Sequence, residues 1–248
     1  MPIKPQFQEL DYRKTDLGEL ILRRRTILSL DNLEVYEIIL GDAFLMSSLF
    51  TVVEEELSRI GLAAASAASP YGTLDVVVGG LGLGYTAVAA LENPAVKSLR
   101  VVDYLEPVIE WHREGLVPLG KTLTGDSRCE LVHGDFFELA LKDKGIGFDS
   151  SDPNRKFHAI LLDIDHSPDN LLHETNAAFY RTEGLQKLKQ QLHPEGVFGL
   201  WSDAPPEANF MDSLAETFAT CESHVVEFYN PLQDITSRST VYIATKEG

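Results

Sequence analysis

A cluster of glycines directly after a short β-branched run constrains this chain more than any other feature of its sequence. The run Val76–Val78 is wholly apolar, which is typical of a parallel strand buried on both faces. The residues that follow it include Gly79, Gly80, Gly82 and Gly84. Such a cluster lets bare backbone approach a ligand, and it leads into a predicted helix over 84–92. The stretch therefore predicts a strand, a tight turn and a helix that together bind a ligand.

An acid at the end of the next predicted strand supports a nucleoside as that ligand. The apolar run 98–103 ends at Asp103, one helix after the glycines. A carboxylate at this position can accept hydrogen bonds from both hydroxyl groups of a ribose. The frame Gly80-x-Gly82-x-Gly84 differs from the GxGxxG pattern of dinucleotide-binding proteins, and an ordinary strand-to-helix turn is the alternative interpretation. We favour a nucleoside site and expect Asp103 and the four glycines to bind the cofactor.

The composition and charge exclude several classes of partner. The chain is 44% hydrophobic and 24% charged, which provides enough apolar material for a globular core. Its formal net charge of −17 repels phosphate groups, so we expect neither nucleic acid nor a membrane as a partner. Cys129 and Cys221 lie far apart without metal-ligand spacing, which favours buried thiols in a reducing compartment. Without an apolar leader or a membrane-spanning run, the sequence predicts a soluble cytoplasmic protein.

Residues 1–41 differ in pattern from the rest of the chain. They carry short β-type runs separated by charged turns, which predicts a small β-rich N-terminal unit. Residues 42–72 are expected to form a helix and a linker. In this prediction Asp42 caps a helix over 43–60, and the Ala/Ser-rich stretch 63–69 is a loop.

Strands and helices alternate over residues 73–248. This alternation predicts a Rossmann-like, doubly wound and mostly parallel sheet. The last two predicted strands, near 223–229 and 238–245, are joined by too few residues for a helical crossover, so they should pair antiparallel. The predicted fold class is therefore α/β, with a C-terminal antiparallel strand pair and a small N-terminal β unit.

Acids follow several of the predicted strands at their carboxyl ends, where open α/β sheets bind their ligands. Asp135 and Phe136 come after the predicted strand 129–133. Asp135 could accept a hydrogen bond from an adenine amino group while the ring of Phe136 packs on the base. Core packing is the alternative interpretation for Phe136, because aromatic residues at strand ends are usually buried.

Asp163 and Asp165 are the predicted catalytic residues. They lie two residues apart after the predicted strand 157–163, and Pro168 stiffens the loop beyond them. Such carboxylates can bind an ammonium group or take a proton from an attacking amine. The alternative for Asp163 is a cap of the turn, and we interpret His166 as a surface residue. No HExxH motif or spaced carboxylate set supports a metal site.

Taken together, these segments resemble the class I S-adenosylmethionine-dependent transferases, and among them the spermidine synthase-like branch. The resemblance covers nearly the whole chain, and its matching segments are 78–84, 102–110, 133–135, 161–165 and 192–197. It implies that Gly80, Gly82 and Gly84 pass along the methionine part of the cofactor. It also implies that Asp103 holds the ribose, that Asp135 contacts the adenine, and that Asp163 faces the transferred group.

Two departures from this branch bear on the reaction. Aminopropyltransferases carry an acid in the glycine loop, which reads GGGDGG, whereas the corresponding residue here is Gly82. Their Asp-x-x-Asp-Pro motif is replaced by Asp163-Ile-Asp-His-Ser-Pro168. Because both changes remove carboxylates that bind ammonium groups, we expect a methyltransferase that uses S-adenosylmethionine on a small amine or hydroxyl acceptor. The alternatives are an aminopropyltransferase that uses decarboxylated S-adenosylmethionine, and a non-catalytic nucleoside-binding protein. A homodimer is left open.

Overall fold

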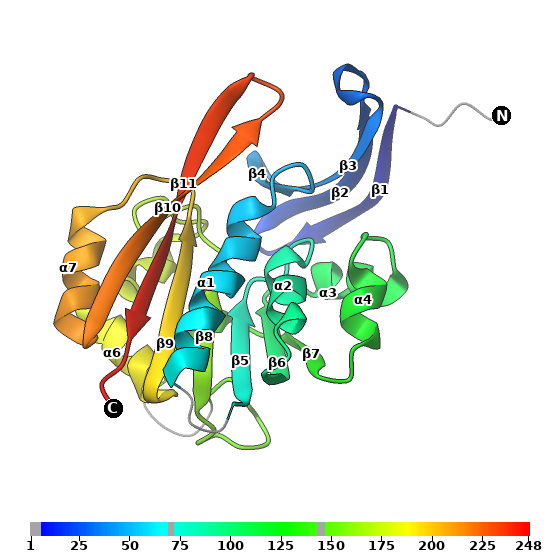
Figure 1. Ribbon diagram of the computed structural model, residues 1–248. Helices are drawn as coiled ribbons and strands as arrows, with labels where there is room; N and C mark the ends of the chain where they lie inside the picture. Colours follow the sequence, from blue (N-terminus) through cyan, green and yellow to red (C-terminus); the bar gives the residue numbers. More distant parts are fainter. Residues whose placement is uncertain (1–5, 69–71, 143–146) are drawn as a thin grey trace.

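The computed structural model describes residues 6–68, 72–142 and 147–248 (Figure 1). It contains a four-stranded sheet with the order β1-β2-β3-β4, and a seven-stranded sheet with the order β10-β11-β9-β8-β5-β6-β7. The expected α/β fold class is confirmed, with its small N-terminal β unit and its C-terminal antiparallel pair. Among the helices of these described ranges, none combines the length and apolar character that crossing a membrane requires.

The N-terminal sheet is antiparallel throughout. One of its faces is apolar and packs on the main core through Leu20, Leu22 and Ile38, which are at most 1% exposed. Its elements are β1 (Phe7–Thr15), β2 (Gly18–Ile27), a short 3₁₀ turn η1 (Leu28–Leu30), β3 (Leu33–Leu40) and β4 (Ala43–Ser47).

The expected helix over 43–60 is wrong in its first part. Residues 43–47 form β4, which pairs with β3 across a tight turn that contains Gly41 at φ +56° and Asp42. Asp42 therefore lies in a hairpin turn and caps no helix. Helix α1 runs over Val52–Ala68 and includes most of the expected loop, because alanine is the strongest helix former. The rest of the expected linker, 69–71, lies outside the described residues.

The main sheet is parallel from β7 to β9, and β11 joins it antiparallel to β9. Val76 and Val78 face one core cluster and Val77 faces the other, so the central strand is buried on both sides as expected. The elements are β5 (Leu74–Gly79), α2 (Tyr85–Glu92), β6 (Val96–Asp103), α3 (Glu106–Glu114), α4 (Gly120–Gly125), β7 (Cys129–His133), α5 (Phe136–Leu141), β8 (Phe157–Leu162), η2 (Glu174–Ala178), α6 (Thr182–Gln190), β9 (Leu192–Ser202), α7 (Ala208–Thr217), β10 (Thr220–Asn230) and β11 (Ile235–Thr245).

The strand order reverses at β5, which lies between β6 and β8. In open α/β sheets the crevice at such a switch point is where ligands bind. Figure 1 shows the N-terminal sheet and the far end of the β10–β11 hairpin projecting beyond this same end of the main sheet. Both projections therefore flank the crevice.

Gly80 should be the least replaceable glycine of the fold. It has φ +92°, and a Cβ there would lie 1.9 Å from the carbonyl oxygen of Asp163. We expect Gly80→Ala to reduce the free energy of unfolding by about 2–4 kcal/mol in thermal or urea melts. Gly125→Ala is the matched control, because a Cβ at Gly125 meets nothing within 4 Å. Equal melting of the two variants would contradict the close approach.

Candidate active site

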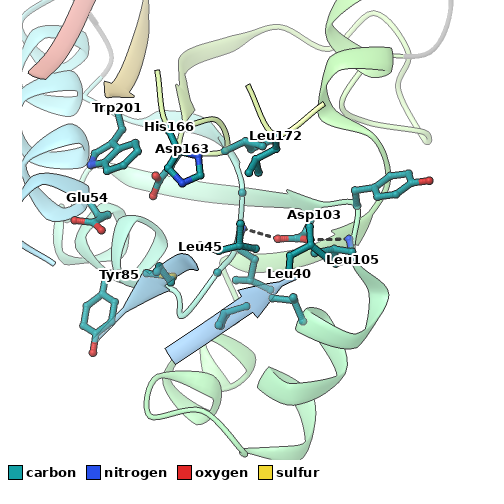
Figure 2. Close-up of a pocket in the computed structure, with 18 of the residues that line it drawn as sticks. Leu40, Leu45, Glu54, Tyr85, Asp103, Leu105, Asp163, His166, Leu172 and Trp201 are labelled. Carbon is teal, nitrogen blue, oxygen red and sulfur yellow. Dashed lines mark hydrogen bonds between the residues drawn. The ribbon is translucent and has the colours of Figure 1, made fainter. Parts of the chain in front are cut away.

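A cavity of about 140 Å³ lies where the glycine loop, the carboxyl ends of the central strands and the N-terminal sheet meet (Figure 2). Its polar lining includes the carboxyl groups of Glu54, Asp103 and Asp163. A large part of its apolar lining comes from the N-terminal sheet and its turn, namely Leu17, Ile38, Leu40, Leu45 and Met46. The small N-terminal sheet is thus one wall of the site.

The glycines of the loop divide into two groups. Gly80 and Gly82 line the cavity, and a Cβ on Gly82 would lie 2.4 Å from the sulfur of Met46. Gly79 and Gly84 support the loop from behind. A Cβ on Gly79 would meet the ring of Phe136 at 2.4 Å, and Gly84 begins α2 at φ +94°. Only the first two offer bare backbone to a ligand.

His112 supports the loop from below, a role that the sequence does not reveal. Its Nε2–H donates to the carbonyl oxygen of Gly82 at 2.9 Å, while burial lowers the pKa of the ring. The side chain is 0% exposed, and Nδ1 is buried without a partner among the described residues. A neutral His112 therefore fixes the orientation of the Gly82 peptide.

Asp103 lies where the sequence predicts, at the end of β6 beside the glycine loop. Its Oδ2 accepts from the backbone N–H of Leu81, and its Oδ1 from that of Leu105, both at 2.8 Å. Burial raises the pKa of Asp103, and the two N–H donors oppose that shift. Each oxygen keeps room for a second donor, so the expected contact with ribose hydroxyls stays a prediction that the geometry allows.

Asp135 and Phe136 do not line the cavity. The Oδ1 of Asp135 caps α5 by accepting from the backbone N–H groups of Phe137 and Glu138 at 2.8 and 3.1 Å. Phe136 is 1% exposed, and its ring packs 5.0 Å from that of Phe148. The structure thus supports the core interpretation of Phe136 rather than stacking on a base, and leaves the adenine contact of Asp135 untested.

Asp163 and Glu54 form a pair of buried carboxyl groups at the other end of the cavity (Figure 2). The hydroxyl of Thr86 donates to Asp163 Oδ2 at 2.5 Å. Burial raises the pKa of Asp163 to about 6. Burial, together with the negative charge of Asp163, raises the pKa of Glu54 to about 8. Near neutral pH the pair therefore holds one proton and one negative charge.

Glu54 is absent from the sequence-based set of site residues. Within Val52-Val53-Glu54-Glu55-Glu56 it resembles a solvent-exposed acid, yet its residue is 8% exposed. The available signal is its spacing from Ser58, Gly61 and Ala65, which share one helical face and are all buried. When an acid lies on the same helical face as several small residues, its carboxyl group is expected to point into the protein.

Asp165 lies away from the cavity, contrary to the expectation that it recognises the acceptor. It is 0% exposed and accepts from the Leu172 backbone N–H at 2.7 Å, Asn176 Nδ2 at 3.0 Å and the Tyr180 hydroxyl at 2.7 Å. These bonds anchor the segment that follows β8. His166, which we interpreted as a surface residue, lines the cavity instead.

No group of three or more His, Cys, Asp or Glu side chains that could hold a metal ion occurs within 6–68, 72–142 and 147–248.

Comparison with known proteins identifies the architecture. The crystal structure of spermidine synthase from Thermotoga maritima matches 96% of this chain and 73% of its own, with a TM-score of 0.71 and 17% identity. This chain has the spermidine synthase fold. A spermidine synthase in complex with the transition state analogue AdoDATO gives a TM-score of 0.70 at 16% identity, covering 96% of this chain and 74% of that one. The likeness confirms the fold that the sequence resemblance implies.

A similarity to a curated protein covers a smaller part of the chain. The polyamine aminopropyltransferase of Sulfolobus acidocaldarius is 27% identical over 153 residues, which is 60% of this chain. The match spans 44% of that relative's length. No protein-family model matches the sequence.

Asp165→Asn should lower the free energy of unfolding. The change puts an NH₂ group among donors that need acceptors, so we expect unfolding to become easier by about 1.5–3 kcal/mol. Asp212→Asn, at an exposed position of α7, is the control and should melt like the wild type. Thermal unfolding of both variants measures the difference. An Asp165→Asn protein with unchanged melting but weakened acceptor binding would restore the sequence-based role.

Glu54→Gln should make stability less dependent on pH. Because folding raises the pKa of Glu54, its contribution is most favourable at low pH and is lost as pH rises towards the folded pKa of about 8. We expect the variant to match the wild type at about pH 5 and to exceed it by about 1–3 kcal/mol at about pH 8.5. Glu56→Gln, on the more exposed side of α1, is the control. A pH-independent difference would contradict the buried pair.

Proposed function

We propose that the chain is an aminopropyltransferase that uses decarboxylated S-adenosylmethionine and an amine acceptor. The observation that carries this proposal is the charge of the cavity. Its lining includes Glu54, Asp103 and Asp163 but no lysine or arginine among the described residues. Such a lining favours sulfonium and ammonium groups over a donor that retains its carboxylate. The relation to a polyamine aminopropyltransferase supports the same choice. This proposal puts the aminopropyltransferase first, whereas the sequence alone favours the methyltransferase.

The residues of the chain fit such a donor. Gly80 and Gly82 line the cavity with backbone that carries no side chain, and Asp103 can accept from hydroxyl groups. The donor supplies a carbon activated by its positively charged sulfur. The protein must then align an amine with that carbon and exclude water, and the apolar side chains of the N-terminal sheet provide that exclusion.

Asp163 is the proposed proton acceptor. The acceptor nitrogen forms a bond to the carbon while the carbon–sulfur bond breaks, so one proton must leave the nitrogen. Asp163 lies directly after β8 and is held by Thr86. Burial raises the pKa of both Glu54 and Asp163, and the hydroxyl of Thr86 donates to Asp163 and favours its charged form, so in this proposal Asp163 is the charged base and Glu54 holds the proton. In this mechanism Glu54 tunes Asp163, and a non-catalytic nucleoside site would need neither acid.

A methyltransferase is the second candidate, and one observation favours it. Gly82 stands where aminopropyltransferases carry an acid, and the sulfur of Met46 lies against this position. The loop therefore offers no carboxylate to the amino group of the donor. Competition binding separates the two candidates. We expect decarboxylated S-adenosylmethionine to bind at least about tenfold more tightly than S-adenosylmethionine, and the reverse order would favour methyl transfer.

Asp163→Asn should stop the reaction without releasing the donor. Loss of a general base lowers turnover by about 10²–10⁴-fold. Donor affinity should fall far less than turnover, because Asp103 and the glycine loop remain to hold the donor while Asp163 takes the proton of the acceptor. Single-turnover transfer to an amine, combined with calorimetric donor binding, gives both quantities. Near-full turnover would reduce Asp163 to a cap of the β8 turn.

A further inference from the structure

A second cavity, of about 250 Å³, adjoins the first. Glu54, His166 and Trp201 are among the residues that line both. Most of the remaining lining comes from β4, from Phe50 shortly after it, and from the β10–β11 hairpin. The N-terminal sheet, which includes β4, and this hairpin are the two parts of the chain that project beyond the main sheet in Figure 1. The boundary between the cavities thus lies beside the Glu54 and Asp163 pair.

The lining of the second cavity combines four aromatic side chains with several polar residues. The rings of Phe50 and Phe228 lie 5.9 Å apart, and Phe44 and Trp201 complete this wall. Apart from Glu54 at the boundary, the acid that lines it is Asp203, an exposed residue after β9. No lysine or arginine is among its described lining residues.

We propose that this second cavity holds the body of the acceptor, and that the acceptor is a primary amine carrying an aromatic or branched apolar group. The inference rests on the proposed function. The reacting amine lies at the boundary beside Asp163, which takes its proton as the aminopropyl group transfers and the neutral thioether leaves. The apolar body then packs against the contacting rings of Phe50 and Phe228, where part of its surface is removed from water.

A linear diamine fits this arrangement less well. With its first nitrogen at the boundary, its second ammonium lies along the aromatic wall, where attraction to the ring faces offsets only part of the cost of losing water. The charged partner beyond that wall is Asp203, at the solvent-exposed rim, where an ion pair contributes little. The aromatic wall therefore selects for an apolar body rather than for a second charge.

Two amines test the proposal by calorimetry in the presence of 5′-methylthioadenosine, the thioether product. We expect 2-phenylethylamine to bind at least about tenfold more tightly than butane-1,4-diamine. Phe228→Leu should weaken 2-phenylethylamine by about three- to tenfold while retaining most of the packing. Tyr229→Ala is the matched control, because this neighbouring residue is 61% exposed. Ser237→Phe, which adds a ring to the cavity lining, should abolish amine binding and leave thioether binding unchanged.

Each outcome is decisive. Tighter binding of butane-1,4-diamine, with a loss on Asp203→Asn and none on Phe228→Leu, overturns the inference and makes the acceptor a polyamine. Transfer from the decarboxylated donor to the diamine alone would leave the proposed function standing and remove the inference. Phe228-dependent binding of 2-phenylethylamine without any aminopropyl product, but with methylation, would retain the cavity assignment and replace the proposed function.

Discussion

The close approach of the glycine loop to the end of β8 is the constraint on which the rest of the site depends. Gly80 comes so near the Asp163 carbonyl that no side chain fits between them. This contact places bare backbone and a buried carboxyl group side by side. Thr86, in the first turn of α2, then holds Asp163. Strand, loop, helix and acid therefore form one rigid unit, and a change at the glycine would displace all of them.

The parallel sheet could be predicted from the sequence because its central strands are apolar runs followed by glycine or acid. β4 could not, since Phe44, Leu45 and Met46 fit a helix or a strand equally well over so short a stretch. The turn at Gly41 brings residues 43–47 back alongside β3, and it is this pairing that makes them a strand rather than a helix. Local pattern is sufficient where an element is long and uniform, but tertiary pairing decides the short ones.

Within the site, the sequence predicts which residues follow the strands better than it predicts where their side chains point. Asp163 and Asp165 follow the same strand, yet one faces the cavity and the other is buried under Asn176 and Tyr180. Side-chain direction after a strand depends on how the loop turns, which spacing does not reveal. Glu54 was missed for the related reason that its partner lies far away in the chain. Helical spacing can indicate that such an acid is buried, but it does not reveal which distant residue the acid faces.

The two cavities are lined by different parts of the chain, and these parts differ in how easily they can accept mutations. The donor side is built mainly on the glycine loop and the strand ends, where a single substitution disturbs the sheet. The far side includes Phe44, Phe50 and residues of the β10–β11 hairpin, which line the second cavity and not the first, and surface segments of this kind tolerate replacement. Descendants of this chain could therefore acquire new acceptors through mutations in these segments while the donor chemistry is inherited intact.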